Sequence, residues 1–264
     1  MTNKKLHVAL LFGGNSSEHD VSKRSAHNVF DAMDKNKYDV SLFMFTKDGI
    51  LLNNEYSQRI FDGEPEDAVV KEAYANMDLD APLAPIQALS TVKQIDFFIP
   101  VIHRNLGEDG TVQGLFRLLK KPYIGSGIAA SAMSFDKKII TQAGIRNTPY
   151  ILLTPENRDQ YDWHAIQEEL GDLVFVKPAK QGSSVGIHKV ENEAELKAAL
   201  DDAFKYDFKV LVEQGIDHPR EIEISILGNE HPIASKLGGI RVPSDDPFYD
   251  YENKFVDASG VVFD

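Results

Sequence analysis

The residues Leu6–Phe12 form an almost continuous apolar run that stops abruptly at Gly13-Gly14. Strands with one solvated face alternate apolar and polar residues, whereas an unbroken run of this kind is typical of a strand buried on both faces. Such strands belong to parallel sheets whose two faces are covered by helices. The run therefore predicts that the chain begins with an open α/β domain.

The next residues support that expectation. Apolar residues recur at helical spacing over Val21–Met33, and Ser16 or Ser17 is the expected N-cap. Residues 53–90 are more polar, and we expect loops there with one short helix. The other predicted elements of this half are a strand over Tyr38–Thr46, a strand over Ile95–Ile102 and a helix over Val112–Lys120.

A second region begins near Gly125 and mixes helices with short strands. Its expected elements are a helix over Ala129–Gly144, strands over Tyr150–Leu153, Val174–Lys177 and Val210–Glu213, and a helix over Glu191–Tyr206. Glu221–Leu227 alternates isoleucines with polar residues, which predicts a strand with one face towards solvent or a ligand.

We therefore predict three regions: an N-terminal α/β domain over 1–125, a central region over 126–211 and a third region over 212–264. The apolar run Gly260–Phe263 has no obvious partner strand. We accordingly expect the third region to be incomplete.

The composition excludes several classes of protein. Among 264 residues, 28 are Lys or Arg and 41 are Asp or Glu, so the formal net charge is −13. This balance argues against nucleic acid as a partner, because phosphate neutralisation needs clustered Lys and Arg. The absence of cysteine excludes disulfides, thiolate metal sites and thiol catalysis. No apolar run approaches the roughly 18 residues of a membrane span, so we expect a cytoplasmic protein without membrane contact.

Residues 13–22, GGNSSEHDVS, join the first predicted strand to the first predicted helix. Backbone N–H groups and the helix dipole can face a ligand at such a position. The same residues also fit a plain tight turn, in which Ser17 and Asp20 form a capping box. Glu18 adds some weight to the ligand-binding alternative, because an acid beside this turn can hold an ammonium group.

Residues 176–187, VKPAKQGSSVGI, begin at the end of a predicted strand and continue into a loop rich in Gly and Ser. Lys177 and Lys180 supply positive charge, while Ser183, Ser184 and the glycines let donors approach phosphate oxygens. The alternative is a basic surface loop. In so acidic a chain we favour phosphate binding, although the Walker spacing is absent.

Three further residues are ambiguous when taken alone. Glu213 and Glu221 flank a turn between two strands, where they can bind a ribose hydroxyl or an adenine amino group, or can simply be solvated. His103 follows an apolar strand at its C-terminal end, where open α/β sheets bind ligands. It opens the string HRNLGEDGTVQG, residues 103–114.

From Leu6 to Phe255 the chain resembles the D-alanine–D-alanine ligases in the motifs GG-N-S-S-E, H-x-x-x-GEDG-x-x-Q-G, P-Y-x-G-S, D-K-K, KP-x-x-x-GSSVG and FYDYENKF. The resemblance implies the ATP-grasp fold, in which two α+β domains hold the nucleotide and an N-terminal α/β domain helps to hold the amino acid. It implies that ATP phosphorylates the carboxylate of one D-alanine, and that a second D-alanine displaces the phosphate. The implied metal is magnesium or manganese, and the implied purpose is peptidoglycan precursor synthesis.

The resemblance also implies a role for each motif residue. Glu18 would hold the ammonium of the first D-alanine, and His103 would lie by its carboxylate. The remaining implied roles are Lys137 and Lys177 at the ATP phosphates, Ser183 and Ser184 in a loop over the phosphates and the first amino acid, Glu213 at the adenine, Glu221 at the ribose, and Lys254 at the γ-phosphate from a mobile loop over 241–257.

The chain departs from the family pattern in several places. Arg104 and Asn105 follow His103, where the family usually has Gly-Pro or similar small residues. Phe255 stands where dipeptide-forming enzymes have tyrosine, and this resembles the D-alanine–D-lactate ligases. The metal-binding acids of the family are expected beyond Asp264, so no metal ligand is assigned.

Several alternatives stay open on the sequence. The second substrate is D-alanine or, from Phe255, D-lactate. Another ATP-grasp carboxylate ligase is a rival within the enzymes, and a nucleotide-binding module without catalysis is a rival from a different class. The family suggests a homodimer.

Overall fold

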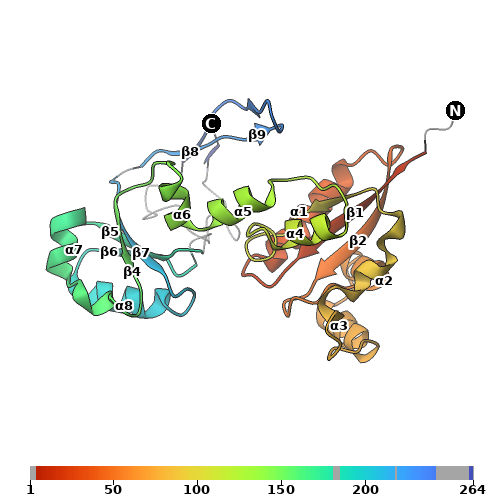
Figure 1. The fold of residues 1–264 in the computed structure, drawn as a ribbon, viewed down its shortest axis with the longest axis horizontal. Coiled ribbons are helices and arrows are strands. Elements are labelled where there is room, and N and C mark those ends of the chain that lie inside the picture. Colours follow the sequence, from red (N-terminus) through yellow and green to blue (C-terminus); the bar gives the residue numbers. More distant parts are fainter. Residues whose placement is uncertain (1–3, 181–184, 218, 242–261, 264) are drawn as a thin grey trace. The chain divides into compact units, whose positions relative to one another are not determined.

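The computed structural model describes residues 4–180, 185–217, 219–241 and 262–263 (Figure 1). The chain divides into two compact units, Met1–Ile140 and Thr141–Asp264. The division into 1–125, 126–211 and 212–264 stays a prediction.

A three-stranded parallel sheet forms the centre of the first unit. β1 (Leu6–Gly13) lies between β2 (Tyr38–Phe45) and β3 (Phe97–Pro100). Alternate residues of β1 enter different cores: Ala9 and Leu11 face one cluster, and Leu10 and Phe12 face the other. The strand is therefore buried on both faces, as its apolar run predicts.

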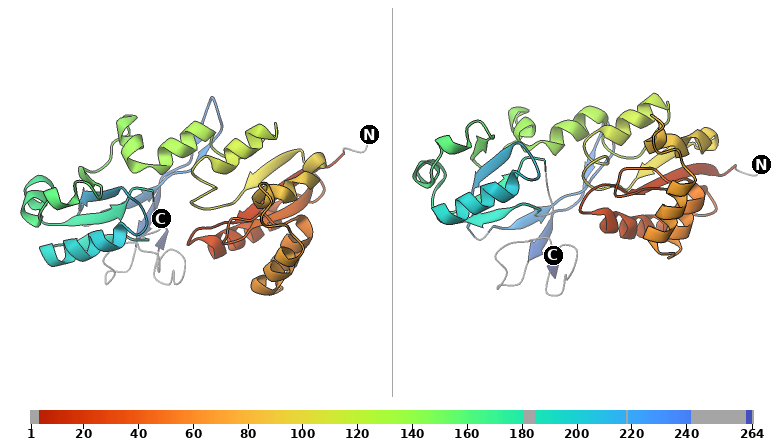
Figure 2. Two further views of the ribbon diagram at one scale, coloured as in Figure 1. Left: turned by 60° about the horizontal axis from the view of Figure 1, so that its bottom comes forward. Right: turned by 90° about the horizontal axis from the view of Figure 1, so that it is seen from below.

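Helices cover both faces of this sheet (Figures 1 and 2). Residues of α1 (His19–Ala32), α2 (Asn54–Phe61) and α3 (Glu66–Ala75) pack in the core with Leu10 and Phe12. The core on the other face includes residues of α4 (Thr111–Leu118) and of a 3-10 helix, η1 (Ala84–Gln94).

The expectation of one short helix within 53–90 is wrong, because that segment holds α2, α3 and most of η1. Its polar residues lie on the outer faces of helices whose inner faces are narrow. The inner faces carry Ser57 and Ile60 in α2, and Val69 and Ala73 in α3. The side chain of Asn53 accepts the backbone N–H of Tyr56 and thereby caps α2.

Two expected details near helix ends are also wrong. The N-cap of α1 is Glu18 rather than Ser16 or Ser17. The helix expected over Ala129–Gly144 is divided into α5 (Ile128–Phe135) and α6 (Lys137–Gln142). The intervening Asp136 accepts the backbone N–H groups of Lys138 and Ile139 through Oδ1, and so begins α6 anew.

A four-stranded antiparallel sheet forms the core of the second unit, in the order β4 (Tyr150–Leu153), β7 (Val210–Gln214), β5 (Val174–Pro178), β6 (His188–Val190). The helices α7 (Trp163–Leu170) and α8 (Glu193–Ala203) pack on one face of it (Figure 2). A short 3-10 helix, η2 (Arg158–Gln160), precedes α7.

The remaining strands are β8 (Glu221–Glu223), β9 (Ile226–Leu227), β10 (Ile233–Ala234), β11 (Gly238–Arg241) and β12 (Val262–Phe263). The single strand expected over Glu221–Leu227 is wrong, because β8 and β9 belong to different sheets. Its isoleucines are not buried on one face, since Ile224 and Ile226 are 50% and 61% exposed. Val262 and Phe263, the described residues of the final apolar run, do have a partner strand, because β12 pairs with β11.

Candidate active site

The turn after β1 requires glycine at its first position. Gly13 has φ +81, and a Cβ there would lie 2.3 Å from the carbonyl oxygen of Phe45. Its N–H donates to the hydroxyl of Ser22 in α1 at 2.8 Å. Gly14, with φ +112, continues the turn. The strand therefore passes closely against its neighbour and leads directly to Glu18 at the start of α1.

The loop after β3 is fastened to this turn by three serines. The hydroxyl of Ser22 also donates to the carbonyl oxygen of Val101. The hydroxyl of Ser16 donates to the carbonyl oxygen of His103 at 3.0 Å. Ser25 Oγ lies 3.2 Å from His103 Nε2. The structure thus brings together the two segments that carry Glu18 and His103, although they are far apart in the sequence.

The carboxylate of Glu18 pairs with Arg104 rather than lying open to solvent. Glu18 is only 4% exposed, and Arg104 Nε donates to its Oε1. Glu108 lies near both residues of this loop. Its Oε2 is 3.9 Å from Arg104 Nη1, and its Oε1 is 3.9 Å from His103 Nδ1. The departure from the family pattern after His103 therefore places a guanidinium directly on the predicted ammonium-binding acid.

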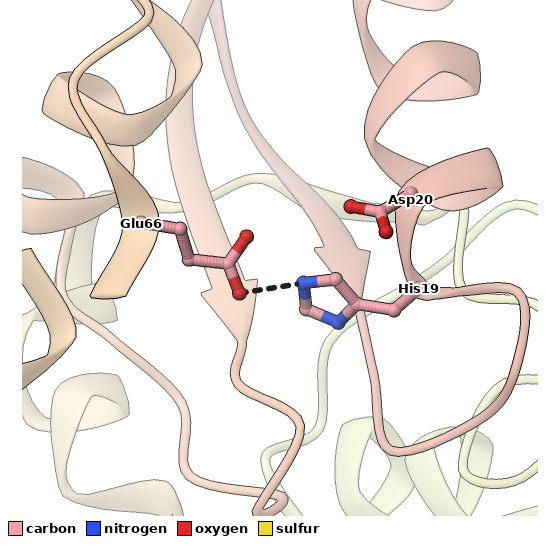
Figure 3. A group of neighbouring side chains, drawn as sticks. All are labelled: His19, Asp20 and Glu66. Atoms are coloured by element: carbon pink, nitrogen blue, oxygen red, sulfur yellow. Dashed lines mark ion pairs between the residues drawn. The ribbon is translucent and has the colours of Figure 1, made fainter.

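A charged network that the sequence analysis missed lies beneath the turn (Figure 3). His19 is 2% exposed, with Nδ1 2.7 Å from the carbonyl oxygen of Gly14 and Nε2 2.9 Å from Oε1 of Glu66 in α3. Both ring nitrogens thus lie close to oxygen atoms. The hydrogen bond from His19 lowers the pKa of Glu66 to about 2, with help from Lys23.

This network has side chains that can ligate a metal ion, but the ammonium group of Lys23 already pairs with its two carboxylates. Ligand atoms of His19, Asp20 and Glu66 lie within 4.8 Å of one another. Lys23, however, pairs with Glu66 and also with Asp20 at 3.3 Å. The arrangement is therefore an ion-pair network that fixes the turn carrying Glu18. The signal that could have found it is His19-Asp20 at the helix start, but its partner lies in a segment we expected to be mostly loop.

In the second unit the structure brings Lys177 and Glu213 together. Glu213 on β7 is 8% exposed, its Oε2 pairs with Lys177 Nζ from β5, and it accepts a hydrogen bond from Thr148 Oγ1 at 3.1 Å. Because Val176 and Val212 face α7 and α8, strand alternation puts Lys177 and Glu213 on the opposite face of the sheet. The lysine predicted to bind phosphate and the acid predicted to bind adenine are thus neighbours.

The other predicted site residues are placed as follows. Lys137 is the first residue of α6 and is half-buried, and Glu221 begins β8 and is also half-buried. Ser183, Ser184, Lys254 and Phe255 lie outside the described residues. Just after the first two, Gly186 has φ +66, and a Cβ there would lie 2.7 Å from the Tyr206 ring. Within the described part of the chain, no helix is long and apolar enough to cross a membrane.

Comparison with known proteins gives this geometry its context. The family model described as D-ala D-ala ligase N-terminus matches residues 7–126, and the one described as D-ala D-ala ligase C-terminus matches residues 139–263. A D-alanine--D-alanine ligase of Limosilactobacillus fermentum is 81% identical over 268 residues, covering 100% of this chain and 71% of the relative. A protein of the same name from Limosilactobacillus reuteri is 77% identical, over 99% of this chain and 70% of the relative.

A solved structure agrees with the sequence relatives. The D-alanine-D-alanine ligase from Coxiella burnetii matches with a TM-score of 0.74 and 32% identity, over 89% of this chain and 71% of that one. The fold is therefore that of an ATP-grasp ligase with an N-terminal α/β domain, which confirms the predicted fold class. The chain belongs to the D-alanine–D-alanine ligase family, a family of ATP-using enzymes.

Proposed function

We propose that this chain carries out the ATP-dependent joining of two D-alanines, through an acylphosphate of the first. The observation that supports this most directly is the burial of two carboxylates, each paired with a basic side chain. One is the acid assigned to the substrate ammonium, and the other is the acid assigned to the nucleotide. Glu18 and Glu213 are both buried beside a cation. Buried carboxylates of this kind are costly, and they persist where a paired charge or a ligand requires them.

In the first unit, Glu18 holds the ammonium of the first D-alanine, and His103 lies by its carboxylate. The hydrogen bond that Ser16 donates to the carbonyl oxygen of His103, and the one between Ser25 Oγ and His103 Nε2, fix the position of His103 relative to Glu18. The network of His19, Glu66 and Lys23 fixes the turn from below. These residues position the substrate, and no protein nucleophile is needed.

In the second unit, Lys177 contacts the ATP phosphates and Glu213 the adenine amino group, while Glu221 meets the ribose. Lys137, which belongs to the first unit, is assigned to the phosphates by resemblance alone. Ser183, Ser184 and Lys254 complete the nucleotide site by resemblance alone. The cations stabilise the charge that develops as the phosphoryl group leaves ATP.

D-Alanine is the second substrate that the comparisons favour. The relatives at 81% and 77% identity carry the name D-alanine--D-alanine ligase, so the D-lactate alternative drawn from Phe255 is not favoured. The dipeptide would serve peptidoglycan precursor synthesis.

Three finer points belong to the same proposal. Magnesium, or manganese, accompanies ATP as the counterion of its phosphates, and no residue of this chain is assigned to it. The protein acts as a homodimer, as the family suggests. It works in the cytoplasm, where ATP is available.

The test is an ADP-release assay with ATP, magnesium and D-alanine, with the products separated by chromatography. We expect ADP and D-alanyl-D-alanine in equal amounts, and we expect Glu18→Gln to raise the half-saturating D-alanine concentration. Release of ADP in response to a different amino acid would favour another carboxylate ligase. Nucleotide binding without phosphate release would favour a binding module.

A further inference from the structure

The contact between Glu18 and Arg104 suggests a role for Arg104, a residue that is not part of the family's motif. Family members usually have small residues after the histidine, whereas this chain has Arg104. Its guanidinium reaches across to the buried acid that we assign to the substrate ammonium. Arg104 and Glu18 thus form a pair of opposite charges within the proposed amino-acid site.

The loop is built to hold Arg104 in that position. Arg104 has φ +66, a left-handed conformation that is strained for a residue with a Cβ. Its carbonyl oxygen accepts the N–H of Glu108 at 2.8 Å. The side chain of Asp109 accepts the N–H groups of Leu106 and Thr111, which closes the turn. A strained residue held by such contacts is a common feature of ligand-binding loops.

The charges of this pair match those of a free amino acid. An amino acid at neutral pH carries an ammonium and a carboxylate separated by one carbon. A carboxylate such as that of Glu18 receives the first, and a planar guanidinium receives the second through two parallel hydrogen bonds. With no ligand bound, the same two protein groups neutralise each other, which lessens the cost of burying Glu18.

We propose that Arg104 is a specificity-determining residue that holds the carboxylate of the first D-alanine while Glu18 holds its ammonium. The inference rests on the proposed function and goes beyond it, because it makes the zwitterion the preferred ligand. His103, next to Arg104, then helps to orient the carboxylate. A ligand with only one of the two charges must break the ion pair between Glu18 and Arg104 and can replace the lost contact of only one of them.

The test compares ligands that differ in one charge. Binding of D-alanine and of D-alaninamide, which lacks the carboxylate, is measured by calorimetry on the full chain and on Arg104→Gly. Glycine is the favoured residue at φ +66, so this variant relieves backbone strain and is expected to fold. We expect D-alanine binding to weaken about tenfold or more, which is about 1.4 kcal/mol. Binding of D-alaninamide should stay within about twofold or improve.

A matched control is Lys120→Gly. Lys120 is an exposed cation in the same unit with φ +55, so its replacement removes one positive charge and relieves the same kind of strain. This variant should bind D-alanine as the unaltered chain does. Arg104→Lys keeps the charge without the planar fork and should fall between the unaltered chain and Arg104→Gly.

The outcomes separate this inference from the proposed function. Unchanged D-alanine binding in Arg104→Gly, or equal weakening for D-alanine and D-alaninamide, would overturn the role of Arg104. Failure of the unaltered chain to bind D-alanine at all would instead refute the proposed function, and the inference with it.

Discussion

Lys177 on β5 and Glu213 on β7 form an ion pair on the face of the sheet opposite α7 and α8. The register pairs Phe175 with Glu213, so Lys177 lies diagonally across from the acid on the same face. Both side chains are largely buried, at 19% and 11% exposed. A nucleotide that contacts both residues must therefore either break this ion pair or bind to both of its members at once. Its contact with Lys177 and its contact with Glu213 are therefore coupled.

Replacing Lys177 by alanine should weaken ATP binding by about 1.5–3 kcal/mol, the size of a charge-assisted hydrogen bond. It should also lower the unfolding temperature, because Glu213 loses its cation. The measurements are calorimetry and thermal unfolding. Lys189→Ala is the control, since Lys189 lies on the neighbouring strand β6 and pairs with Glu191. An unchanged ATP affinity in folded Lys177→Ala would show that the lysine does not hold the phosphates.

The network beneath the turn predicts a dependence of stability on pH. The pKa of Glu66 falls from its ordinary value of 4.5 to about 2, chiefly through the hydrogen bond from His19. A carboxyl with a lowered pKa stabilises the folded state fully above its unfolded pKa and loses that contribution as pH falls through its folded pKa. We expect Glu66→Gln to lower the free energy of unfolding by about 2–3 kcal/mol at neutral pH.

That difference between the unaltered chain and Glu66→Gln should shrink as the pH falls from about 4.5 to about 2. Urea unfolding at a series of pH values measures it. Glu72→Gln is the control in the same helix, because Glu72 pairs with Arg59 but is half exposed, and exposed pairs contribute little. A difference that stays constant over this pH range would contradict the assigned cause.

Patterns within short stretches predicted the fold well. The apolar run Leu6–Phe12 predicted a strand buried on both faces. In the structure, successive side chains of this strand point to opposite faces of the sheet and so enter two different cores. Only one short helix was expected in 53–90, because the buried faces of α2 and α3 carry only two residues each, among them Ile60 and Val69. A periodic signal that narrow is hard to distinguish from a polar loop.

Contacts between residues that are far apart in the sequence could not be predicted from the sequence patterns. The sequence suggested Glu18, His103, Lys177 and Glu213 one by one, but it carries no signal for which side chain each contacts. The partner of Glu18 is 86 residues away, and the partner of Glu213 lies on another strand. Such pairings follow from sheet order and loop geometry, which a single sequence does not specify.

Gly13→Ala should destabilise the first unit more than Gly49→Ala. The two glycines have nearly the same backbone conformation, with φ +81 and φ +79. A Cβ at Gly49 meets nothing within 4 Å, so that variant measures the left-handed strain alone, about 1–2 kcal/mol. At Gly13 the Cβ would also collide with the carbonyl oxygen of Phe45. Equal unfolding free energies for the two variants would show that the close approach of β1 to β2 is unimportant.

Ser22 and Ser57 allow the role of the turn in substrate binding to be separated from its role in stability. Both serines are 0% exposed. The Ser22 hydroxyl accepts the N–H of Gly13 and donates to Val101, and the Ser57 hydroxyl accepts the N–H of Met44 and donates to Leu52. Alanine at either position leaves a buried donor and a buried acceptor without partners, at a cost of about 1–3 kcal/mol for each group.

We therefore expect Ser22→Ala and Ser57→Ala to lower the free energy of unfolding by similar amounts. Of the two variants, only Ser22→Ala should also raise the half-saturating D-alanine concentration, because Ser22, unlike Ser57, joins the turn of Glu18 to the loop of His103 and Arg104. Urea unfolding and initial rates of ADP release, both measured well below the unfolding temperature, give the two quantities. If both variants raise that concentration equally, global loosening of the unit explains the effect, and the serine does not position the site.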